Sequence, residues 1–286
     1  MTITESLRAA KSLLAEAGVP DSRLDAEYLL SHVLNQNRMA LLMNGREELS
    51  PAHQAAFDQL LKRRAQRVPL QYLLQSQDFM GLSLYVDESV LIPRPETEQL
   101  CEQALLWLSK RQENDSPTVL DLCTGSGALA VAIAHALPKA KVSAADLSQK
   151  ALDVARRNAD AYHAKISFLQ GDFLNAAAGQ KFDLIVCNPP YIPSSECSHL
   201  QPEVLMEPSM ALDGGEDGLH YYRKLAVEAP RFLCPGGALF CEVGFDQAQV
   251  VRDLFSPSFE RIEILQDLSG IPRIVSAFLS FGGAHV

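Results

Sequence analysis

The chain has 286 residues, of which 47% are apolar, 21% charged and 7% aromatic, as is usual for a globular protein with a substantial core. The formal net charge of −10 at pH 7 argues against a nucleic-acid-binding surface spread over the whole protein. The six cysteines form no C-x-x-C pair, which argues against structural zinc and favours reduced, buried thiols. No apolar run approaches the roughly 18 residues of a membrane span. We therefore expect a cytoplasmic protein that holds no metal.

The first 75 residues carry the pattern of a small helical bundle. Thr2 and Glu5 form a capping-box pattern, and apolar residues then recur at helical spacing up to Gly18. A second helix is expected to begin at Asp21 and a third at Ser50, which is followed by a proline. The bundle contains one basic cluster, which indicates either a solvated helix end or a contact with an acidic partner: Lys62, Arg63, Arg64 and Arg67.

Residues 76–95 predict a β-hairpin that links the bundle to the rest of the chain. Apolar residues at a period of two surround Gly81, as in two short antiparallel strands. Two prolines then flank Arg94 and stiffen an extended segment, after which a helix runs through Trp107. The polar stretch from Gln112 to Pro117 indicates a further linker.

Strand and helix patterns alternate in the remainder of the chain, residues 96–286, as is typical of a parallel α/β sheet. The loop from Ile192 to Gly218 has no regular pattern over about 27 residues, which favours a binding loop or a lid. A closing antiparallel pair makes the last strand the antiparallel member of a mostly parallel sheet. The expected strands are Thr118–Leu122, Lys141–Ala145, Ile166–Leu169, a run that ends at Asn188, Ala238–Val243, Phe259–Leu265 and Ile274–Leu279. The expected helices among them are Ala128–Ala136, Ser148–Ala161, Tyr222–Phe232 and Gln247–Phe255.

Four residues follow the apolar fourth strand and form the strongest candidate for a catalytic site: Asn188, Pro189, Pro190 and Tyr191. Ligands of such sheets lie just outside the carboxyl ends of the strands. The side-chain oxygen of Asn188 and the fixed carbonyl of Pro189 are two acceptors that could hold both hydrogens of one –NH₂ group. Tyr191 would add a flat wall. The alternative is a plain strand end followed by a Pro-Pro turn.

An amino group on an amide or a nucleobase is a poor nucleophile, because its lone pair is delocalised into the neighbouring π-system. Two acceptors on its hydrogens would turn the nitrogen lone pair toward an electrophile, which is catalysis by positioning. The motif therefore favours chemistry on an –NH₂ group, with no metal and no strong base required.

A glycine-rich turn between the first strand and its helix is the candidate cofactor loop: Cys123, Thr124, Gly125, Ser126 and Gly127. With Asp146 about 20 residues on, at the end of the second strand, the pattern fits either a dinucleotide or S-adenosylmethionine, since both need an acid for the ribose hydroxyls. Asp121 would lie badly beside a pyrophosphate and suits a ligand with a positive amino-acid end. Asp172 could accept from an adenine amino group while Phe173 packs on the ring. Taken singly, each acid could equally be a helix cap or a solvated carboxylate.

These motifs, in this order, resemble those of class I S-adenosylmethionine-dependent methyltransferases that act on amino groups, which have a Rossmann-like sheet. The residues that carry the resemblance are Asp121 to Gly127, Asp146 and Asn188 to Tyr191. The chain is similar over nearly its whole length to the protein-(glutamine-N5) methyltransferases of peptide chain release factors, the PrmC/HemK family. That narrower resemblance rests on Leu91 to Glu98, Glu207-Pro208, Leu212 to Gly218 and Glu242-Val243-Gly244 with Gln247.

The resemblance implies the substrate and the roles of the site residues. The acceptor would be the glutamine of a Gly-Gly-Gln (GGQ) tripeptide in a release factor, held by Asn188 and the Pro189 carbonyl. The N-terminal bundle would dock that substrate, and no direct contact with nucleic acid or membrane is expected. The cofactor would be S-adenosylmethionine, held by the glycine turn and by Asp121, Asp146, Asp172, Phe173 and Asn188. The family often has glycine where this chain has Cys123, and it favours glycine at Gln75.

Other functions fit less of the sequence. A methyltransferase of adenine or guanine amino groups would use the same Asn188 geometry, but it predicts basic surface and stacking aromatics, which a net charge of −10 disfavours. A dehydrogenase would leave Asn188 to Tyr191 unexplained, and so would a nucleotide-binding module without enzyme activity.

Overall fold

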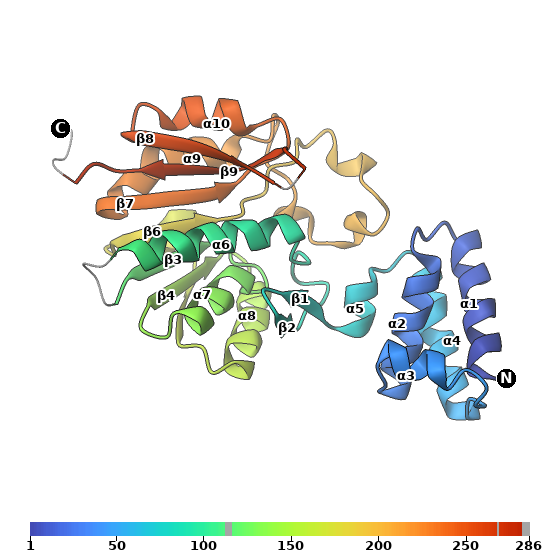
Figure 1. Cartoon of the computed structure of the whole chain (residues 1–286). Coiled ribbons are helices and arrows are strands. Elements are labelled where there is room, and N and C mark those ends of the chain that lie inside the picture. The colour runs from blue at the N-terminus through green and yellow to red at the C-terminus, as the bar shows by residue number, and fades with distance from the viewer. Residues whose placement is uncertain (112–115, 268, 282–286) are drawn as a thin grey trace. The chain divides into compact units, whose positions relative to one another are not determined.

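The computed structural model describes residues 1–111, 116–267 and 269–281 (Figure 1), so most of the linker expected at 112–117 lies outside the described residues. The chain forms two compact units. The first comprises Met1–Ser76 together with Gln201–Met206, and the second comprises Gln77–Leu200 together with the chain from Glu207 onward. Among the described residues, no helix is long and apolar enough to cross a membrane.

The first unit is helical, as its sequence predicts. Thr2 caps the first helix in a full capping box with Glu5, and Ser50 caps the fourth. Leu14, Leu29 and Phe57 are fully buried in its core. Two short helices were not foreseen, because five or six residues are too few for a helical period to appear. The helices are α1 (Ile3–Glu16), α2 (Ser22–Leu34), α3 (Arg38–Met43), α4 (Pro51–Ala65) and α5 (Leu70–Leu74).

The basic cluster of this unit is partly buried and paired. Arg64 is 5% exposed, and its Nε lies 2.7 Å from Asp25 Oδ2. Its Nη2 lies 2.9 Å from Glu203 Oε1, and Arg67 Nη2 lies 2.6 Å from Glu203 Oε2. The prediction of a solvated helix end is therefore wrong for these two arginines. Their acidic partners belong to this chain, and Glu203 reaches the unit from the long loop.

The second unit is built on a seven-stranded sheet with the strand order β5-β4-β3-β6-β7-β9-β8. All its strands run parallel except β9, which pairs antiparallel with β7 and with β8, so the predicted mostly parallel sheet with an antiparallel last strand is confirmed. The strands are β3 (Thr118–Leu122), β4 (Lys141–Asp146), β5 (Ile166–Gln170), β6 (Phe182–Cys187), β7 (Leu233–Glu242), β8 (Arg261–Gln266) and β9 (Pro272–Phe278).

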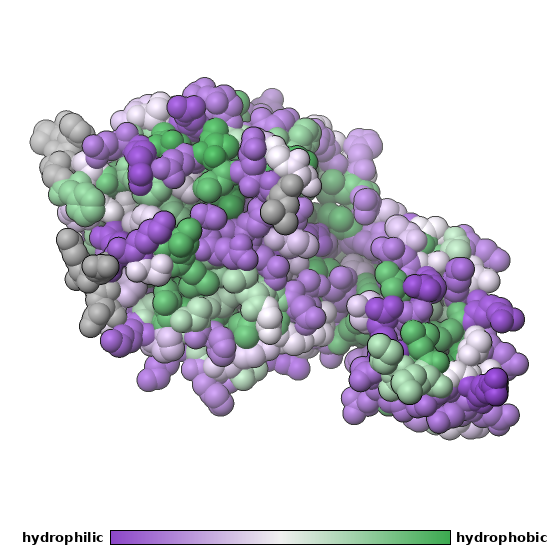
Figure 2. Space-filling model, in the orientation of Figure 1, coloured by the Kyte–Doolittle hydropathy of each residue, from purple (hydrophilic) through white to green (hydrophobic). Residues whose placement is uncertain are grey.

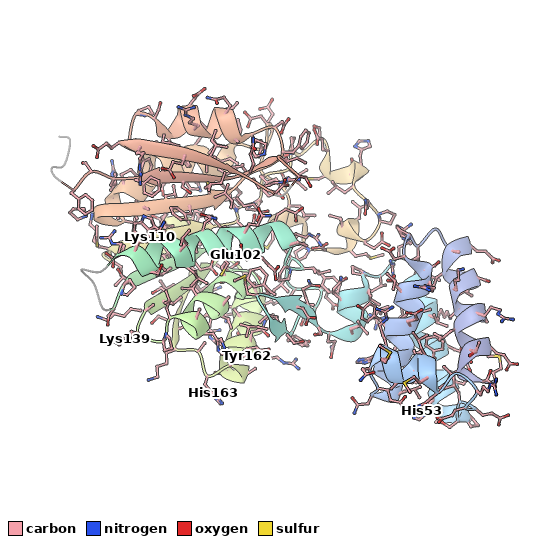
Figure 3. The ribbon with its side chains drawn as sticks, in the orientation of Figure 1. His53, Glu102, Lys110, Lys139, Tyr162 and His163 are labelled. Atoms are coloured by element: carbon pink, nitrogen blue, oxygen red, sulfur yellow. The ribbon has the colours of Figure 1, made fainter. Side chains whose placement is uncertain are left out.

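Helices cover both faces of this sheet, because successive residues of a strand point to opposite faces. Val119 packs in one core with α6 and α7, whereas Leu120 packs in the other with α9 and α10. Helix α6 buries Leu100 and leaves Glu102 and Lys110 on the outside (Figure 3). The helices are α6 (Pro95–Lys110), α7 (Ala128–Ala136), α8 (Gln149–Ala161), α9 (His220–Glu228) and α10 (Ala248–Phe255).

Two connections of the second unit bear on the site. The predicted hairpin is present as β1 (Gln77–Phe79) and β2 (Leu82–Leu84), paired antiparallel. The loop expected to lack regular structure contains short 3-10 turns at Cys197–His199, Val204–Met206 and Ser209–Ala211. Its two ends are joined by a bridge between Ile192 and Asp213.

Hydrophilic residues predominate on the face of the molecule seen in Figure 2, with apolar residues in separate patches between them. This surface accords with the 35 acidic and 25 basic residues of the chain. The apolar side chains of the sheet are turned inward instead, and β6 is buried along its whole length. Polar groups of these central strands can therefore reach a ligand only where the strands end.

Gly127 lies in the turn that precedes α7, where helix α8 leaves little room for a side chain. Its φ is +80°, and a Cβ at this position would lie 2.9 Å from the Cβ and 3.1 Å from the Cα of Ala155 on α8. Gly179 has a similar φ of +79° but no described atom within 4 Å of such a Cβ. We predict that Gly179→Ala costs about 1 kcal/mol of unfolding free energy and Gly127→Ala about 2–4 kcal/mol. Urea denaturation of both variants measures the difference, and equal losses would show that α8 does not crowd the turn.

Candidate functional site

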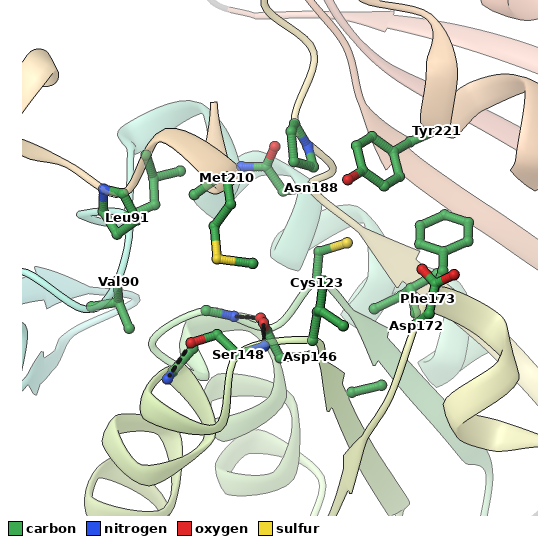
Figure 4. A pocket seen from close by; sticks show the side chains of 18 of the residues that line it. Val90, Leu91, Cys123, Asp146, Ser148, Asp172, Phe173, Asn188, Met210 and Tyr221 are labelled. Carbon is green, nitrogen blue, oxygen red and sulfur yellow. Dashed lines mark hydrogen bonds between the residues drawn. The ribbon is translucent and has the colours of Figure 1, made fainter. Parts of the chain in front are cut away.

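A pocket lies at the carboxyl ends of β3, β4 and β6 (Figure 4), all within the second unit. Seven of the residues predicted from the sequence line it: Cys123, Gly125, Asp146, Asp172, Phe173, Asn188 and Pro190. Six others lie in the same turns or at the strand end before them without lining the pocket: Asp121, Thr124, Ser126, Gly127, Pro189 and Tyr191. The strand ends therefore bring together the chemistry that the sequence placed far apart.

The turn after β3 is shaped by three residues with positive φ. Gly125 has a φ of +54°, and an added Cβ would meet no described atom within 4 Å, so its backbone is open to a ligand. Cys123 has a φ of +60°, a left-handed conformation that costs a non-glycine residue roughly 1–2 kcal/mol. Glycine would adopt the same conformation without that cost.

Asp121 lies 1% exposed beneath this turn, with one oxygen occupied and one without a partner. Its Oδ2 accepts from the Thr124 hydroxyl at 2.5 Å and from the Ala130 amide at 3.0 Å. Its Oδ1 is buried and has no hydrogen-bond partner within the part of the chain that the structure describes. Burial raises the pKa of Asp121 to about 7. A buried acceptor without a donor fits a ligand that brings a positively charged amino group.

Asp146 ends β4 and faces the pocket. Its Oδ2 accepts from the Gly125 amide at 2.9 Å and its Oδ1 accepts from the Ser148 amide at 2.8 Å. Burial raises the pKa of this carboxyl above its ordinary value. A carboxylate has about four lone-pair positions, so two acceptor positions remain for the hydroxyls of a ribose.

Asp172 and Phe173 follow β5 at the edge of the pocket. The Asp172 side chain is 62% exposed and lies 3.7 Å from Lys224 Nζ. Phe173 is buried with a φ of +53°, and its ring centroid lies 5.4 Å from that of Tyr221. This pair offers a carboxylate and an aromatic edge to a ligand, and Figure 4 shows both beside the pocket.

Asn188 is held by a chain of hydrogen bonds that the sequence did not reveal. Its Nδ2 donates to Thr97 Oγ1 at 3.1 Å, and Thr97 Oγ1 donates to Glu242 Oε2 at 2.6 Å. Because its nitrogen is engaged in this way, its Oδ1 is the atom left to accept a hydrogen bond in the pocket. Tyr191 turns its hydroxyl toward Glu242 Oε1, at 3.4 Å, and its carbonyl accepts from Gln247 at 2.9 Å.

Several lining residues were missed by the sequence analysis. The long loop contributes Pro208, Met210 and Ala211 to the lining of the pocket. Leu147 lines the pocket and is 55% exposed. An apolar residue directly after a strand-end acid was a signal that could have found it. The remaining missed residues are Ser89, Val90, Leu91, Leu122, Ala145, Ser148, Ala151, Gly171 and Tyr221.

The sheet order, the glycine turn and the polar strand ends together define a Rossmann-like methyltransferase, and comparison with known proteins agrees. Residues 102–270 match the methyltransferase small domain, and residues 5–74 match the PrmC N-terminal domain. A solved methyltransferase from Pyrococcus furiosus shares the fold, with a TM-score of 0.55 and 18% identity, over 77% of this chain and 98% of its own. A 16S rRNA methyltransferase from Thermus thermophilus shares it with a TM-score of 0.53 and 20% identity, over 71% of this chain and 49% of its own.

Curated relatives narrow the class further. A release factor glutamine methyltransferase of Geobacter sulfurreducens is 44% identical over 96% of this chain and 95% of its own length. Proteins of the same name from Moorella thermoacetica and Bordetella pertussis are 43% and 44% identical, over 97% and 94% of this chain and 99% and 98% of their own lengths. The chain belongs to the release factor glutamine methyltransferase family. It is an S-adenosylmethionine-dependent methyltransferase, and the open glycine turn and the unpartnered Asp121 oxygen fit that cofactor.

Asp121 provides a test of cofactor binding. If its carboxylate meets the amino group of S-adenosylmethionine, affinity should increase as the pH rises from about 6 to about 8, because the carboxyl ionises in that range. We predict that Asp121→Asn weakens binding at pH 8 by about tenfold and removes this pH dependence. Isothermal titration calorimetry measures both quantities.

Asp153→Asn is the matched control for that experiment, because the Asp153 side chain is 64% exposed and does not line the pocket. This variant should keep the pH dependence of the parent protein. An Asp121→Asn protein that is folded and binds with the original pH profile would remove Asp121 from the cofactor site.

Proposed function

We propose that this protein transfers a methyl group from S-adenosylmethionine to the side-chain amide nitrogen (N5) of the glutamine in the GGQ motif of peptide chain release factors. The observation that carries this proposal is the orientation of Asn188, whose Nδ2 donates to Thr97 at 3.1 Å and leaves Oδ1 as an acceptor at the pocket. The names of the relatives from Geobacter sulfurreducens and Moorella thermoacetica support the same substrate.

The proposed catalysis is by orientation of the acceptor amide. Asn188 Oδ1 and the Pro189 carbonyl accept the two N–H hydrogens of the glutamine and turn its nitrogen toward the electrophile. When bound, the cofactor supplies a methyl carbon on a positively charged sulfur, so that a nitrogen–carbon bond replaces the carbon–sulfur bond and one proton is released. Water can take that proton, because an alkylated amide nitrogen is very acidic. No metal is needed for this chemistry.

The cofactor residues form the second part of the proposal. Asp146 accepts from the ribose hydroxyls, Asp172 and Phe173 lie beside the adenine, and Asp121 meets the amino group. The open backbone at Gly125 and the unpartnered oxygen of Asp121 support this assignment. The turn that holds the cofactor comprises Cys123, Thr124, Gly125, Ser126 and Gly127.

Three consecutive segments of the chain have different roles in the proposed reaction. Residues 1–75 dock the release factor, 76–95 link the two parts, and 96–286 bind the cofactor and the acceptor glutamine. The match of residues 5–74 to the PrmC N-terminal domain supports a distinct role for the bundle. The six free cysteines support a cytoplasmic location, and the net charge of −10 supports a protein substrate without direct nucleic-acid contact.

Asn188 Oδ1 and the Pro189 carbonyl together form what we call the acceptor clamp, and Asn188→Ala tests its role. We predict that kcat falls by about a hundredfold or more, because the orientation of the amide nitrogen is lost, while affinity for S-adenosylmethionine changes less than about twofold. Single-turnover kinetics and calorimetry separate the two effects. A single-turnover rate near that of the parent protein would mean that another group holds the amide.

The substrate itself is tested with variants of the release factor. Replacing the GGQ glutamine by glutamate removes both N–H donors, and replacing it by asparagine shortens the reach by one methylene. We predict that mass spectrometry finds one added methyl group on that glutamine and none on either variant. A methyl group that appeared on adenine or guanine of DNA or RNA offered in parallel would overturn the protein substrate while leaving the Asn188 geometry intact.

A further inference from the structure

Asn188, Thr97 and Glu242 come from three elements and meet at one point. Cys187 of β6 pairs with Cys241 of β7, so the residues that follow them, Asn188 and Glu242, emerge from adjacent strand ends. Thr97 lies in the first turn of α6 and is 5% exposed. Glu242 is 2% exposed, which makes it a carboxyl group buried directly behind the acceptor clamp.

We propose that Glu242 and Thr97 are positioning residues that fix which end of the Asn188 amide faces the acceptor glutamine. The inference rests on the proposed function of Asn188 and extends it to two residues that do not line the pocket. Glu242 acts through Thr97, and Thr97 acts through Asn188. Neither residue touches the substrate.

The hydrogens in this chain allow only one arrangement when Glu242 is ionised. A carboxylate has no hydrogen to donate, so the single hydroxyl hydrogen of Thr97 goes to Glu242 Oε2. Thr97 Oγ1 then has only lone pairs left for Asn188, and only the –NH₂ end of the amide can meet them. Asn188 Oδ1 is consequently directed away from Thr97 as an acceptor, which is the orientation that the clamp requires.

Protonation of Glu242 would permit the opposite arrangement. A protonated carboxyl can donate to Thr97, and Thr97 can then donate to Asn188 Oδ1, which turns the amide –NH₂ toward the pocket. The two N–H hydrogens of the Asn188 amide would then face the N–H hydrogens of the acceptor glutamine. The two sets of donors would repel each other, and the glutamine amide could not be bound there. The charge on Glu242 therefore determines whether Asn188 can accept.

The surroundings of Glu242 bring this switch near neutral pH. Burial raises the pKa of Glu242 to about 7, and nearby Glu96 contributes in the same direction. The hydrogen bonds from Thr97 and Tyr191 and the charge of Arg273 oppose that rise. The Tyr222 hydroxyl donates to the Glu242 carbonyl at 2.9 Å and so holds the backbone instead of the carboxyl. The groups that surround the carboxyl thus come from α6, β9 and the segment after β6.

Thr97→Val and Thr97→Ser form the first test. Valine keeps the shape of the side chain and removes the hydroxyl, so we predict a fall in kcat of about tenfold or more with little change in affinity for S-adenosylmethionine. Serine keeps the hydroxyl and should restore most of the activity. Adding Thr97→Val to Asn188→Ala should cost little further activity, because Thr97 acts only through Asn188.

Thr118→Val is the matched control. Thr118 also binds a buried acid, Asp183, with its Oγ1 2.9 Å from Asp183 Oδ2, but it stands at the opposite end of β3. Its loss should affect stability and leave kcat unchanged. Equal losses of kcat in Thr97→Val and Thr118→Val would overturn the positioning role. So would a loss of kcat in the Thr97→Val, Asn188→Ala double variant that equals the product of the two single losses.

The pH dependence forms the second test. The kcat of the parent protein should fall below an apparent pKa of about 7, since Glu242 must be ionised, and Glu242→Gln should lose this acid limb. The side-chain ¹⁵N resonance of Asn188, assigned by its absence in Asn188→Ala, should shift over the same pH range and stop shifting in Glu242→Gln. This second readout does not depend on turnover.

The outcomes separate this inference from the function on which it rests. If the parent protein methylates the release factor but Glu242→Gln keeps the acid limb and the Asn188 titration, the positioning role is wrong and the proposed function stands. If the parent protein leaves the GGQ glutamine unmodified, the proposed function fails. The NMR titration would still report whether Glu242 controls the Asn188 amide.

Discussion

The parallel pairing of β3, β6 and β7 is the constraint on which the site depends. Strand β6 is buried along its whole length between these neighbours, so the first position at which it can offer a polar side chain to a ligand is Asn188, just past its end. The neighbouring strands end at the same edge because they run in the same direction. Any polar residue near their ends is therefore brought close to Asn188, however distant it is in the sequence.

Two buried acids flank β6 and divide the site into two halves. Asp121 lies near the end of β3 and Glu242 at the end of β7, and burial raises the pKa of each to about 7. Burying a carboxyl group is costly unless something compensates it. In the proposed function the compensation differs on the two sides, with the cofactor's amino group meeting Asp121 and the Thr97 hydroxyl meeting Glu242. In these proposals β6 separates Asp121, which binds the cofactor, from Glu242, which orients Asn188.

The sequence predicted the fold and the strand-end motifs because these depend on short-range patterns. Apolar runs, turn residues and the Asn188 to Tyr191 motif can each be read within a few neighbouring positions. The partners of Asn188 could not be predicted, because Thr97 lies 91 residues before Asn188 in a helix, and Glu242 comes beside Asn188 only through the register of β6 and β7. The pairing of Arg64 with Glu203 was missed for the same reason, since nothing near Arg64 in the sequence indicates a distant acid.

Because Gln201–Met206 belongs to the helical unit, the unit is encoded by two separate segments of the gene. This limits how the unit could be exchanged between homologous genes. A gene fragment that ended after residue 76 would encode the five helices without Glu203, and Arg64 would keep only Asp25 as an acidic partner. The bundle is therefore not a cassette that recombination could exchange at a single boundary. A hybrid that takes the bundle from one homologue and the loop from another would combine charges that had not evolved together.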